Sequence, residues 1–158
     1  MKNTFNVSIT DSDIFIASDH RGFELKGSIF NELKSMNKNI FDLGPYIFDI
    51  NDDYPDYASK LGEVISDNSC GILICGSGNG MIIAANKFPN VRAILAYNIF
   101  SVEMGRKHNN ANVIVIPSDL INSVDDTMGL IKIWLSTLFD NEERHNRRLD
   151  KIRLYSRD

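Results

Sequence analysis

The sequence contains only two cysteines, Cys70 and Cys75, among its 158 residues. They stand at opposite ends of one apparent strand, so in an extended chain their Cα atoms lie roughly 16 Å apart. A disulfide requires Cα atoms within about 7 Å of each other. We therefore expect two free thiols, as is typical of a reducing compartment, and no metal site, because two thiols alone do not hold a metal ion.

The sequence also lacks a long apolar run and an excess of basic residues. No segment approaches the ~20 apolar residues of a membrane-spanning helix, and Met1 to Asp13 lack the basic start, apolar centre and small-residue cleavage site of a signal peptide. The formal net charge of −4 is opposite to the basic bias of a dedicated nucleic-acid-binding protein. We expect a cytoplasmic protein that binds neither nucleic acid nor a membrane.

What is present is the composition of one ordinary globular domain. Apolar residues make up 43% and charged residues 24% of the chain, and 158 residues suffice to bury a substantial core. Residues 1–12 are polar and aperiodic, and we expect them to form a loosely held extension. Residues 13–152 are predicted to form a single domain that ends in a basic helix, and residues 153–158 a tail.

Short apolar runs alternate with segments of helical periodicity along this domain. The predicted strands are 13–17, 40–43, 71–75, 91–96 and 112–116, and the predicted helices are 23–36, 56–66, 81–87, 99–107, 123–138 and 142–152. The alternation is typical of a doubly wound, Rossmann-like α/β domain, a parallel five-stranded sheet with helices on both faces. We expect the strand order 2-1-3-4-5, which brings the loops after strands 1 and 3 together at a ligand-binding edge.

The third strand leads into a glycine-rich loop. The thiol of Cys75 ends the strand, and Gly76, Ser77, Gly78, Asn79 and Gly80 follow before a helix begins. Glycines let the backbone approach a ligand closely, and the N–H groups of a helix start favour an anion or an oxyanion. The spacing matches neither the dinucleotide-binding fingerprint nor the P-loop. A tight turn without chemistry stays an alternative at this point.

Three further polar segments can be explained by local structure, and two of them also by ligand binding. Asp19 and His20 could bind a sugar hydroxyl and a phosphate, or they could be a helix cap and a surface histidine. The basic residues 106–108 end a helix, where positive charge suits the dipole. Arg144 and Arg148 lie in a basic tail that is either a solvated face or a phosphate clamp, since guanidinium groups match phosphate bidentately.

Taken together, these segments resemble a known family, the type B ribose-5-phosphate isomerases. The resemblance covers residues 13–152 in order, and the broader family also contains isomerases of galactose 6-phosphate and allose 6-phosphate. The segments that carry it are Ser-Asp-His-Arg-Gly-Phe-Glu-Leu-Lys (18–26), Asp-Tyr-Pro-Asp-Tyr-Ala (53–58), Ile-Cys-Gly-Ser-Gly-Asn-Gly-Met (74–81), Ala-Ala-Asn-Lys (84–87), Arg-Lys-His-Asn-Asn-Ala-Asn-Val (106–113) and Arg-His-x-x-Arg (144–148).

The resemblance implies a cofactor-free aldose–ketose isomerase that acts on a phosphorylated sugar through a cis-enediolate. Cys75 would be the base, while Ser77 and the loop amides of Gly76, Gly78, Asn79 and Gly80 would stabilise the enediolate oxygens. His108, helped by Asp19, would serve ring opening. A thiol is a usable base only when its pKa is lowered, and we expect the helix N-terminus to lower it.

The resemblance also implies how the substrate is held. The residues assigned to substrate binding are Asn109 for the sugar oxygens, His20, Arg144 and Arg148 for the phosphate, and Tyr54 for the pocket wall. The family is dimeric or tetrameric with active sites at the interface. We therefore expect a homodimer or a tetramer whose active sites are shared between chains.

The chain departs from its relatives at two positions. Some relatives place an acidic base where this chain has Met81, so the chain resembles the cysteine type. Many relatives carry an arginine just after the last strand, where this chain has Asp119. An acid there would repel a phosphate if it pointed inward, and Arg147 is a candidate to replace the missing cation.

These observations favour the interconversion of ribose 5-phosphate and ribulose 5-phosphate, a step of the pentose phosphate pathway. The first alternative is an isomerase of a six-carbon phosphosugar, allose 6-phosphate or galactose 6-phosphate. The second is a non-catalytic subunit that only binds a phosphosugar. The presence of Cys75 and His108 argues against this second alternative.

Overall fold

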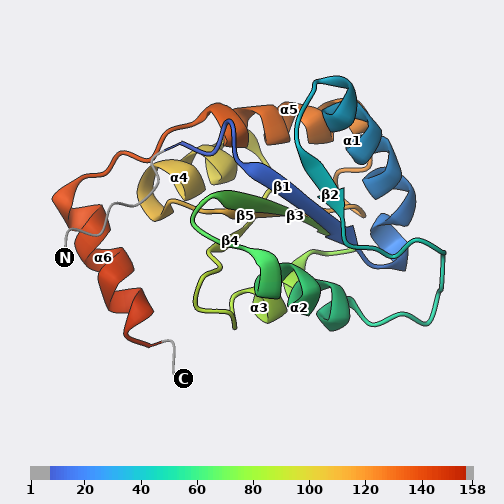
Figure 1. Cartoon of the computed structure of the whole chain (residues 1–158), viewed down its shortest axis with the longest axis horizontal. Helices are drawn as coiled ribbons and strands as arrows, with labels where there is room; N and C mark the ends of the chain where they lie inside the picture. The colour runs from blue at the N-terminus through green and yellow to red at the C-terminus, as the bar shows by residue number, and fades with distance from the viewer. Residues whose placement is uncertain (1–7, 156–158) are drawn as a thin grey trace.

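A parallel sheet of five strands runs through the centre of the described part of the chain, residues 8–155 of a computed structural model. Its strands are β1 (Asp13–Ser18), β2 (Ile40–Asp42), β3 (Ser69–Cys75), β4 (Ala93–Leu95) and β5 (Val113–Pro117). The spatial order is β2-β1-β3-β5-β4. The predicted doubly wound α/β fold, a five-stranded parallel sheet with helices on both faces, is confirmed (Figure 1).

The predicted order 2-1-3-4-5 was wrong for the last two strands, which are exchanged. β5 pairs with β3 from Gly71↔Val113 to Cys75↔Pro117, and β4 lies outside it at the edge. All five residues of β5 are buried, whereas two of the three residues of β4 are only half-buried. A strand that is apolar on both faces is more stable between two neighbours, so β5 takes the inner place.

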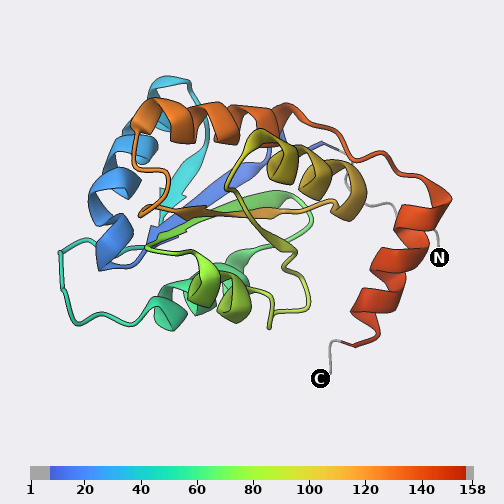
Figure 2. The same ribbon diagram turned by 180° about the vertical axis from the view of Figure 1, so that it is seen from behind.

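Helices cover both faces of the sheet, as the sequence predicted. They are α1 (Phe23–Ser35), α2 (Tyr54–Val64), α3 (Asn79–Ala85), α4 (Ile99–Asn109), α5 (Val124–Ser136) and α6 (Glu143–Arg153), with a short 3₁₀ helix, η1 (His20–Gly22), after β1. In Figures 1 and 2, α1, α4 and α5 lie on one face of the sheet and α2 and α3 on the other. None of the helices in residues 8–155 has the length and apolarity needed to cross a membrane.

β3 is a central strand of the sheet, and all seven of its residues are buried. Successive side chains of a strand point to opposite faces. Ile72 and Ile74 therefore join the core under α1 and α5, while Leu73 and Cys75 join the core under α2 and α3. This alternation directs the thiol of Cys75 toward the layer that contains the glycine loop and α3. Both cysteines are free and buried, as expected.

The segment before β1 is packed where the structure describes it. Ile9 is buried in the main core, and the hydroxyl of Thr10 donates a hydrogen bond of 2.9 Å to the carbonyl of Leu135. These contacts attach Ile9 and Thr10 to the domain. The rest of the expected extension, residues 1–7, and residues 156–158 of the expected tail lie outside the described residues.

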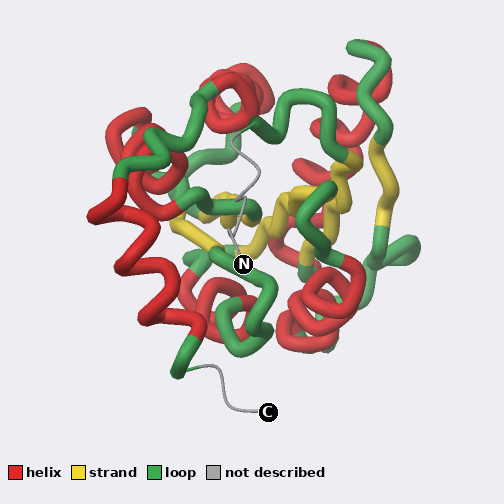
Figure 3. Tube along the Cα trace, turned by 60° about the vertical axis from the view of Figure 1, so that its left-hand side comes forward, coloured by secondary structure: helices red, strands yellow, loops and turns green. Residues whose placement is uncertain are grey.

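α6 lies apart from the sheet, along one side of the molecule (Figures 1 and 3). Only His145 and Leu149 of this helix are buried, and Leu149 forms a small cluster with Phe139 that is separate from the two main cores. Ile152 and Leu154, by contrast, are exposed. The helix is thus attached to the domain by few apolar contacts.

Candidate active site

Cys75 lies where β3 ends and the glycine loop begins. Cys75 is 4% exposed. Gly78 caps α3 with a φ of 79°, a left-handed conformation that favours glycine. Burial raises the pKa of the Cys75 thiol, and the charge of Asp19 raises it further, while the backbone N–H groups of Gly78 and Met81 lower it in part. The expectation that the helix start alone lowers this pKa is therefore wrong for the single chain, because burial outweighs the two N–H groups.

Asp19 follows β1 directly and lies beside the thiol. Its carboxylate accepts hydrogen bonds from the backbone N–H groups of Arg21 at 2.9 Å and Gly22 at 3.2 Å, which caps η1. Burial raises the pKa of Asp19, although these two hydrogen bonds lower it in part. The pairing of β1 with β3 brings the loops after the two strands together, which confirms the expected switch point.

His20 is held by a residue that the sequence analysis did not single out. Its Nδ1 lies 2.6 Å from Oδ1 of Asp52, and its backbone N–H donates to the same oxygen at 3.1 Å. Asp52 comes from the loop between β2 and α2, immediately before the segment 53–58 that carried the resemblance. The acidic composition of that loop was visible in the sequence, but no pattern connects one of its carboxylates to a histidine 32 residues earlier.

Tyr54 and Gly80 lie against each other at the same edge of the sheet. A Cβ on Gly80 would stand 2.8 Å from the Tyr54 hydroxyl oxygen and closer still to the ring. The loop residue must therefore lack a side chain for the tyrosine to lie there. Ser77 and Asn79 are exposed on the same loop, and the N–H of Asn79 donates a long hydrogen bond of 3.4 Å to the Ser77 hydroxyl.

An ion pair that the sequence did not predict crosses the start of the loop. Nε and Nη2 of Arg21 donate to Oδ1 of Asp119 at 3.1 and 2.7 Å. A Cβ on Gly76 would lie 2.5 Å from Arg21 Nε and 2.8 Å from Asp119 Oδ2. The backbone N–H of Asp119 in turn donates to the carbonyl of Gly76 at 3.0 Å. Asp119, the departure from the family pattern, is thus paired with a cation of its own chain.

Cys75 and Asp19 lie where the strands end, which we call the carboxyl edge of the sheet. The four remaining predicted site residues lie at the other side, where the strands begin, which we call the amino edge. α4 follows a strand and runs back antiparallel to it, so His108 and Asn109 at its end are at the amino edge (Figure 2). Arg144 and Arg148 are exposed on α6, which lies beside that edge. One chain therefore does not bring these four residues to Cys75.

The residues at the amino edge make their own contacts. The rings of His108 and His145 have centroids 4.5 Å apart, and Nε2 of His108 lies 3.9 Å from Oδ2 of Asp140. Nε of Arg144 donates to Oε2 of Glu142 at 2.7 Å. His145 is 2% exposed, and its buried Nδ1 has no hydrogen-bond partner among the described residues.

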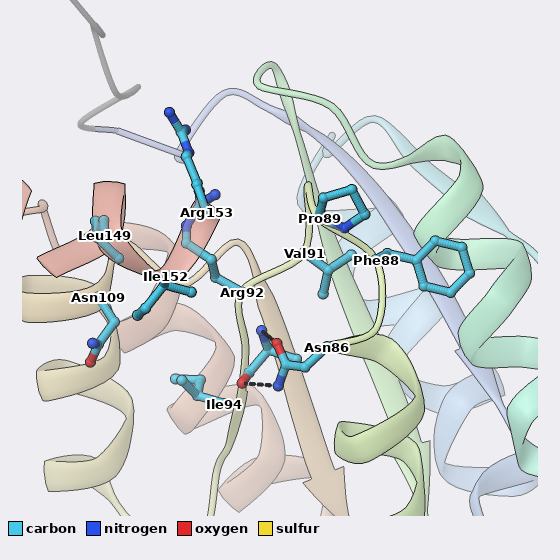
Figure 4. Close-up of a pocket in the computed structure, with 11 residues that line it drawn as sticks. Asn86, Phe88, Pro89, Val91, Arg92, Ile94, Asn109, Leu149, Ile152 and Arg153 are labelled. Carbon is cyan, nitrogen blue, oxygen red and sulfur yellow. Dashed lines mark hydrogen bonds between the residues drawn. The ribbon is translucent and has the colours of Figure 1, made fainter. Parts of the chain in front are cut away.

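A cavity of about 270 Å³ lies at this amino edge, between α6 and the segment before β4 (Figure 4). Asn86 forms one wall and is fixed by a 3.0 Å hydrogen bond to the carbonyl of Ala93. Of the predicted site residues, Asn109 is the one that lines this cavity. The cavity is therefore separate from the thiol. Within residues 8–155, no group of three or more His, Cys, Asp or Glu side chains is placed to hold a metal ion.

The chain is similar to known proteins over nearly its whole length. The family model described as Ribose/Galactose Isomerase matches residues 14–152. Ribose-5-phosphate isomerase B of Mycolicibacterium paratuberculosis is 36% identical over 146 residues, covering 91% of this chain and 91% of that protein. The matched region includes the glycine loop, both edges of the sheet and nearly all of α6.

Solved structures show the same similarity. The crystal structure of a ribose 5-phosphate isomerase from Thermotoga maritima has a TM-score of 0.85 and 41% identity, covering 90% of this chain and 98% of that one. The structure of ribose-5-phosphate isomerase B from Mycoplasma genitalium, with bound ribulose-5-phosphate, has a TM-score of 0.83 and 42% identity, covering 90% of this chain and 95% of that one.

Proposed function

The chain belongs to the ribose/galactose isomerase family, and on that premise we propose that it interconverts ribose 5-phosphate and ribulose 5-phosphate through a cis-enediolate. The observation that carries the proposal is the placement of Cys75, whose sulfur lies against the N–H groups of Gly78 and Met81 and beside Asp19. A relative of 42% identity holds ribulose-5-phosphate in its structure. The proposed chemistry uses side chains and backbone amides alone.

In this reaction, the Cys75 thiolate removes the proton from C2 of the open-chain aldose, and the electron pair of that C–H bond forms the enediolate. The oxygen at C1 takes up a proton, and the O2 hydroxyl loses its proton as the ketone forms. The thiol then returns its proton to C1. Amides of the loop and the exposed Ser77 hydroxyl donate to the enediolate oxygens, and one such donor supplies on the order of 3–4 kcal/mol of transition-state stabilisation.

The active site is proposed to be completed by a second chain, in a homodimer or tetramer. In one chain the thiol faces carboxylates, Asp19 and Asp119, whereas the cations Arg144 and Arg148 lie at the other edge. A partner that supplies His108, Asn109 and these arginines would bring positive charge to a thiol whose pKa is raised in isolation. Opposite charges within about 4–6 Å favour the ionised form, so assembly would produce the thiolate.

Exposed apolar side chains at both edges support this assembly. Ile47 and Phe48 lie in the loop that carries Asp52 and are 82% and 53% exposed, and the Phe48 ring packs edge-on beside His20. At the other edge, Ile152 and Leu154 are exposed on α6 and after it. Apolar surface of this kind marks an interaction site in a folded protein. The cytoplasmic location expected from the sequence belongs to the same proposal.

A coupled assay tests the choice of substrate. We expect kcat/KM for ribose 5-phosphate to exceed the values for allose 6-phosphate and galactose 6-phosphate by at least about 100-fold, because a pocket fitted to a five-carbon chain misplaces a longer one relative to the base. A higher kcat/KM for either six-carbon sugar would overturn the assignment. Turnover of none of the three would favour a non-catalytic phosphosugar-binding subunit.

A further inference from the structure

The ion pair of Arg21 and Asp119 joins three segments around the Cys75 loop. Arg21 belongs to η1, Asp119 follows β5, and both side chains lie across Gly76, which has no room for a Cβ. The Ser118 hydroxyl donates to the carbonyl of Arg21 at 3.2 Å, and the N–H of Ser118 donates to the carbonyl of Cys75 at 2.9 Å. Arg21 is thereby held at the entrance to the loop through both its backbone carbonyl and its guanidinium group.

Stabilisation of the fold is a poor explanation for this pair. The side chains of Arg21 and Asp119 are 54% and 49% exposed, and ion pairs that are open to water contribute little to stability. The pair also does not stabilise the fold by filling a cavity in the core, because it lies over a backbone turn. The charges of Asp19 and Cys75 also act on the pKa of Arg21, which the hydrogen bonds and charge of Asp119 raise. The pair therefore stands within electrostatic range of the reacting thiol.

One edge of the guanidinium remains open. A guanidinium group can donate two parallel hydrogen bonds from its Nε–Nη2 edge or from its Nη1–Nη2 edge. Asp119 occupies the Nε–Nη2 edge, and Nη1 makes no hydrogen bond to any residue in the described range 8–155. The open Nη1–Nη2 edge can bind a phosphate bidentately.

We infer that Arg21 is a substrate-binding residue of this chain, which donates from its free edge to the phosphate of the sugar, and that Asp119 is the positioning residue that holds the guanidinium over Gly76. The inference rests on the proposed function and adds a cation to the same site. It also accounts for the acid after β5, because Asp119 neutralises and orients Arg21 instead of facing the phosphate alone. His20, the neighbour of Arg21 in η1, would contact the same phosphate.

The test uses the full-length chain and four variants: Arg21→Ala, Arg21→Lys, Asp119→Asn in the Arg21→Ala background, and Lys132→Ala. Lys132→Ala is the matched control, since it removes one positive charge from the exposed face of α5, away from the loop. Binding of inorganic phosphate is measured from the rise of Tm with phosphate concentration, against potassium chloride of equal ionic strength. KM and kcat are measured with ribose 5-phosphate.

We expect Arg21→Ala to raise both the apparent Kd for phosphate and KM by about 10-fold or more, the loss typical of a hydrogen bond between charged groups. kcat should change by less than about threefold, because the contact exists before and during the reaction. Arg21→Lys should recover part of the affinity. Asp119→Asn should recover part of the loss in the Arg21→Ala background, because it removes a carboxylate left unpaired near the phosphate.

Equal values of Kd and KM in Arg21→Ala and Lys132→Ala would overturn the inference and leave the proposed function intact. Phosphate binding that depends on Arg21, in a chain that turns over no sugar phosphate, would overturn the proposed function and leave Arg21 as an anion-binding residue. A drop in kcat with unchanged KM and Kd would also overturn the inference, since it would show that the pair acts on the loop and not on the phosphate.

Discussion

The two edges of the sheet carry the two sets of residues that are proposed to form the active site. At the carboxyl edge, Cys75 and Asp19 lie under an ordered loop, fixed by backbone hydrogen bonds and by packing against β1 and β5. At the amino edge, Arg144 and Arg148 stand exposed on a helix that buries only two residues. The carboxyl edge holds the proposed base, whose pKa is raised by burial, and the amino edge holds two exposed arginines without a base.

A parallel α/β fold limits which residues a single chain can bring together. Each helix that connects two strands returns the chain to the amino edge, so residues at the carboxyl end of such a helix lie away from residues that end a strand. His108 ends α4 and Cys75 ends β3. A second copy can place its amino edge against this carboxyl edge, and the exposed apolar residues at both edges fit that arrangement.

The largest expected effect comes from removing the basic half. Deleting residues 140–158 should abolish turnover and weaken the dimer, because it removes Arg144 and Arg148 together with the exposed apolar residues of α6. The core should stay folded, since Trp134 and the rest of α5 are retained and the main core includes no residue of α6. Sedimentation velocity and far-UV circular dichroism separate the two effects. A truncated chain with normal kcat would contradict the account.

Removing the base should cost nearly as much. Cys75→Ala should retain fold and substrate binding and lose at least ~100-fold in kcat, the scale of a positioned general base. Cys70→Ala is the matched control at the other end of the same strand and should keep near-normal kcat. Burial raises the pKa of Cys70 to about 12, so iodoacetamide should modify Cys75 faster, and bound phosphosugar should protect it.

Near-normal turnover in Cys75→Ala would transfer the role of the base to another group. Asp19 is the next candidate, because burial raises its pKa and it lies beside the thiol. Asp19→Asn would then show the larger loss in kcat of the two variants.

The pH dependence of alkylation at Cys75 tests whether cations of the amino edge reach the thiol. Because burial raises the pKa of Cys75 in one chain, the thiolate forms only as the pH rises above the ordinary thiol value, and cations from a partner should move that midpoint down. The double variant Arg144→Ala/Arg148→Ala should therefore shift the midpoint of Cys75 alkylation upward by about one pH unit or more. Identical midpoints in this variant and the wild type would show that the arginines do not reach the thiol.

The smallest expected effect concerns the support of His20. Asp52→Asn weakens the 2.6 Å contact that fixes the imidazole, and we expect KM for the phosphosugar to rise about 3- to 10-fold with little change in kcat, the range for one ordinary hydrogen bond. Asp53→Asn is the control, because it changes the adjacent carboxylate, which makes no side-chain cap on α2. Equal KM values in the two variants would exclude a role for Asp52.

The sequence predicted the fold class and the glycine loop after Cys75 because local signals determine both. Apolar runs mark the strands, and the glycines after Cys75 mark the turn that exposes backbone N–H groups. The order of β4 and β5 was wrong because both runs are apolar, and only packing shows that the longer one takes the inner place. The pKa of Cys75 was misjudged because burial at the end of β3 is a tertiary property.

Contacts between residues far apart in the chain also could not be predicted from the sequence. Arg21 and Asp119 are separated by 98 residues, and nothing in either local sequence pairs them. Asp52 likewise reaches His20 across a loop of irregular structure. The family resemblance assigned His108, Arg144 and their neighbours to the site and implied sites shared between chains, but the position of these residues at the amino edge came from the structure.

The most direct test of the account mixes two inactive chains. Cys75→Ala and Arg144→Ala each disable one half of the site, and a mixed dimer of the two contains one site with both wild-type halves. After subunit exchange, demonstrated by native mass spectrometry, an equal mixture should recover roughly a quarter of wild-type activity, as random pairing in a twofold dimer gives. If exchange is complete and no activity returns, the base and the arginine belong to the same chain, and the account of a shared site is contradicted.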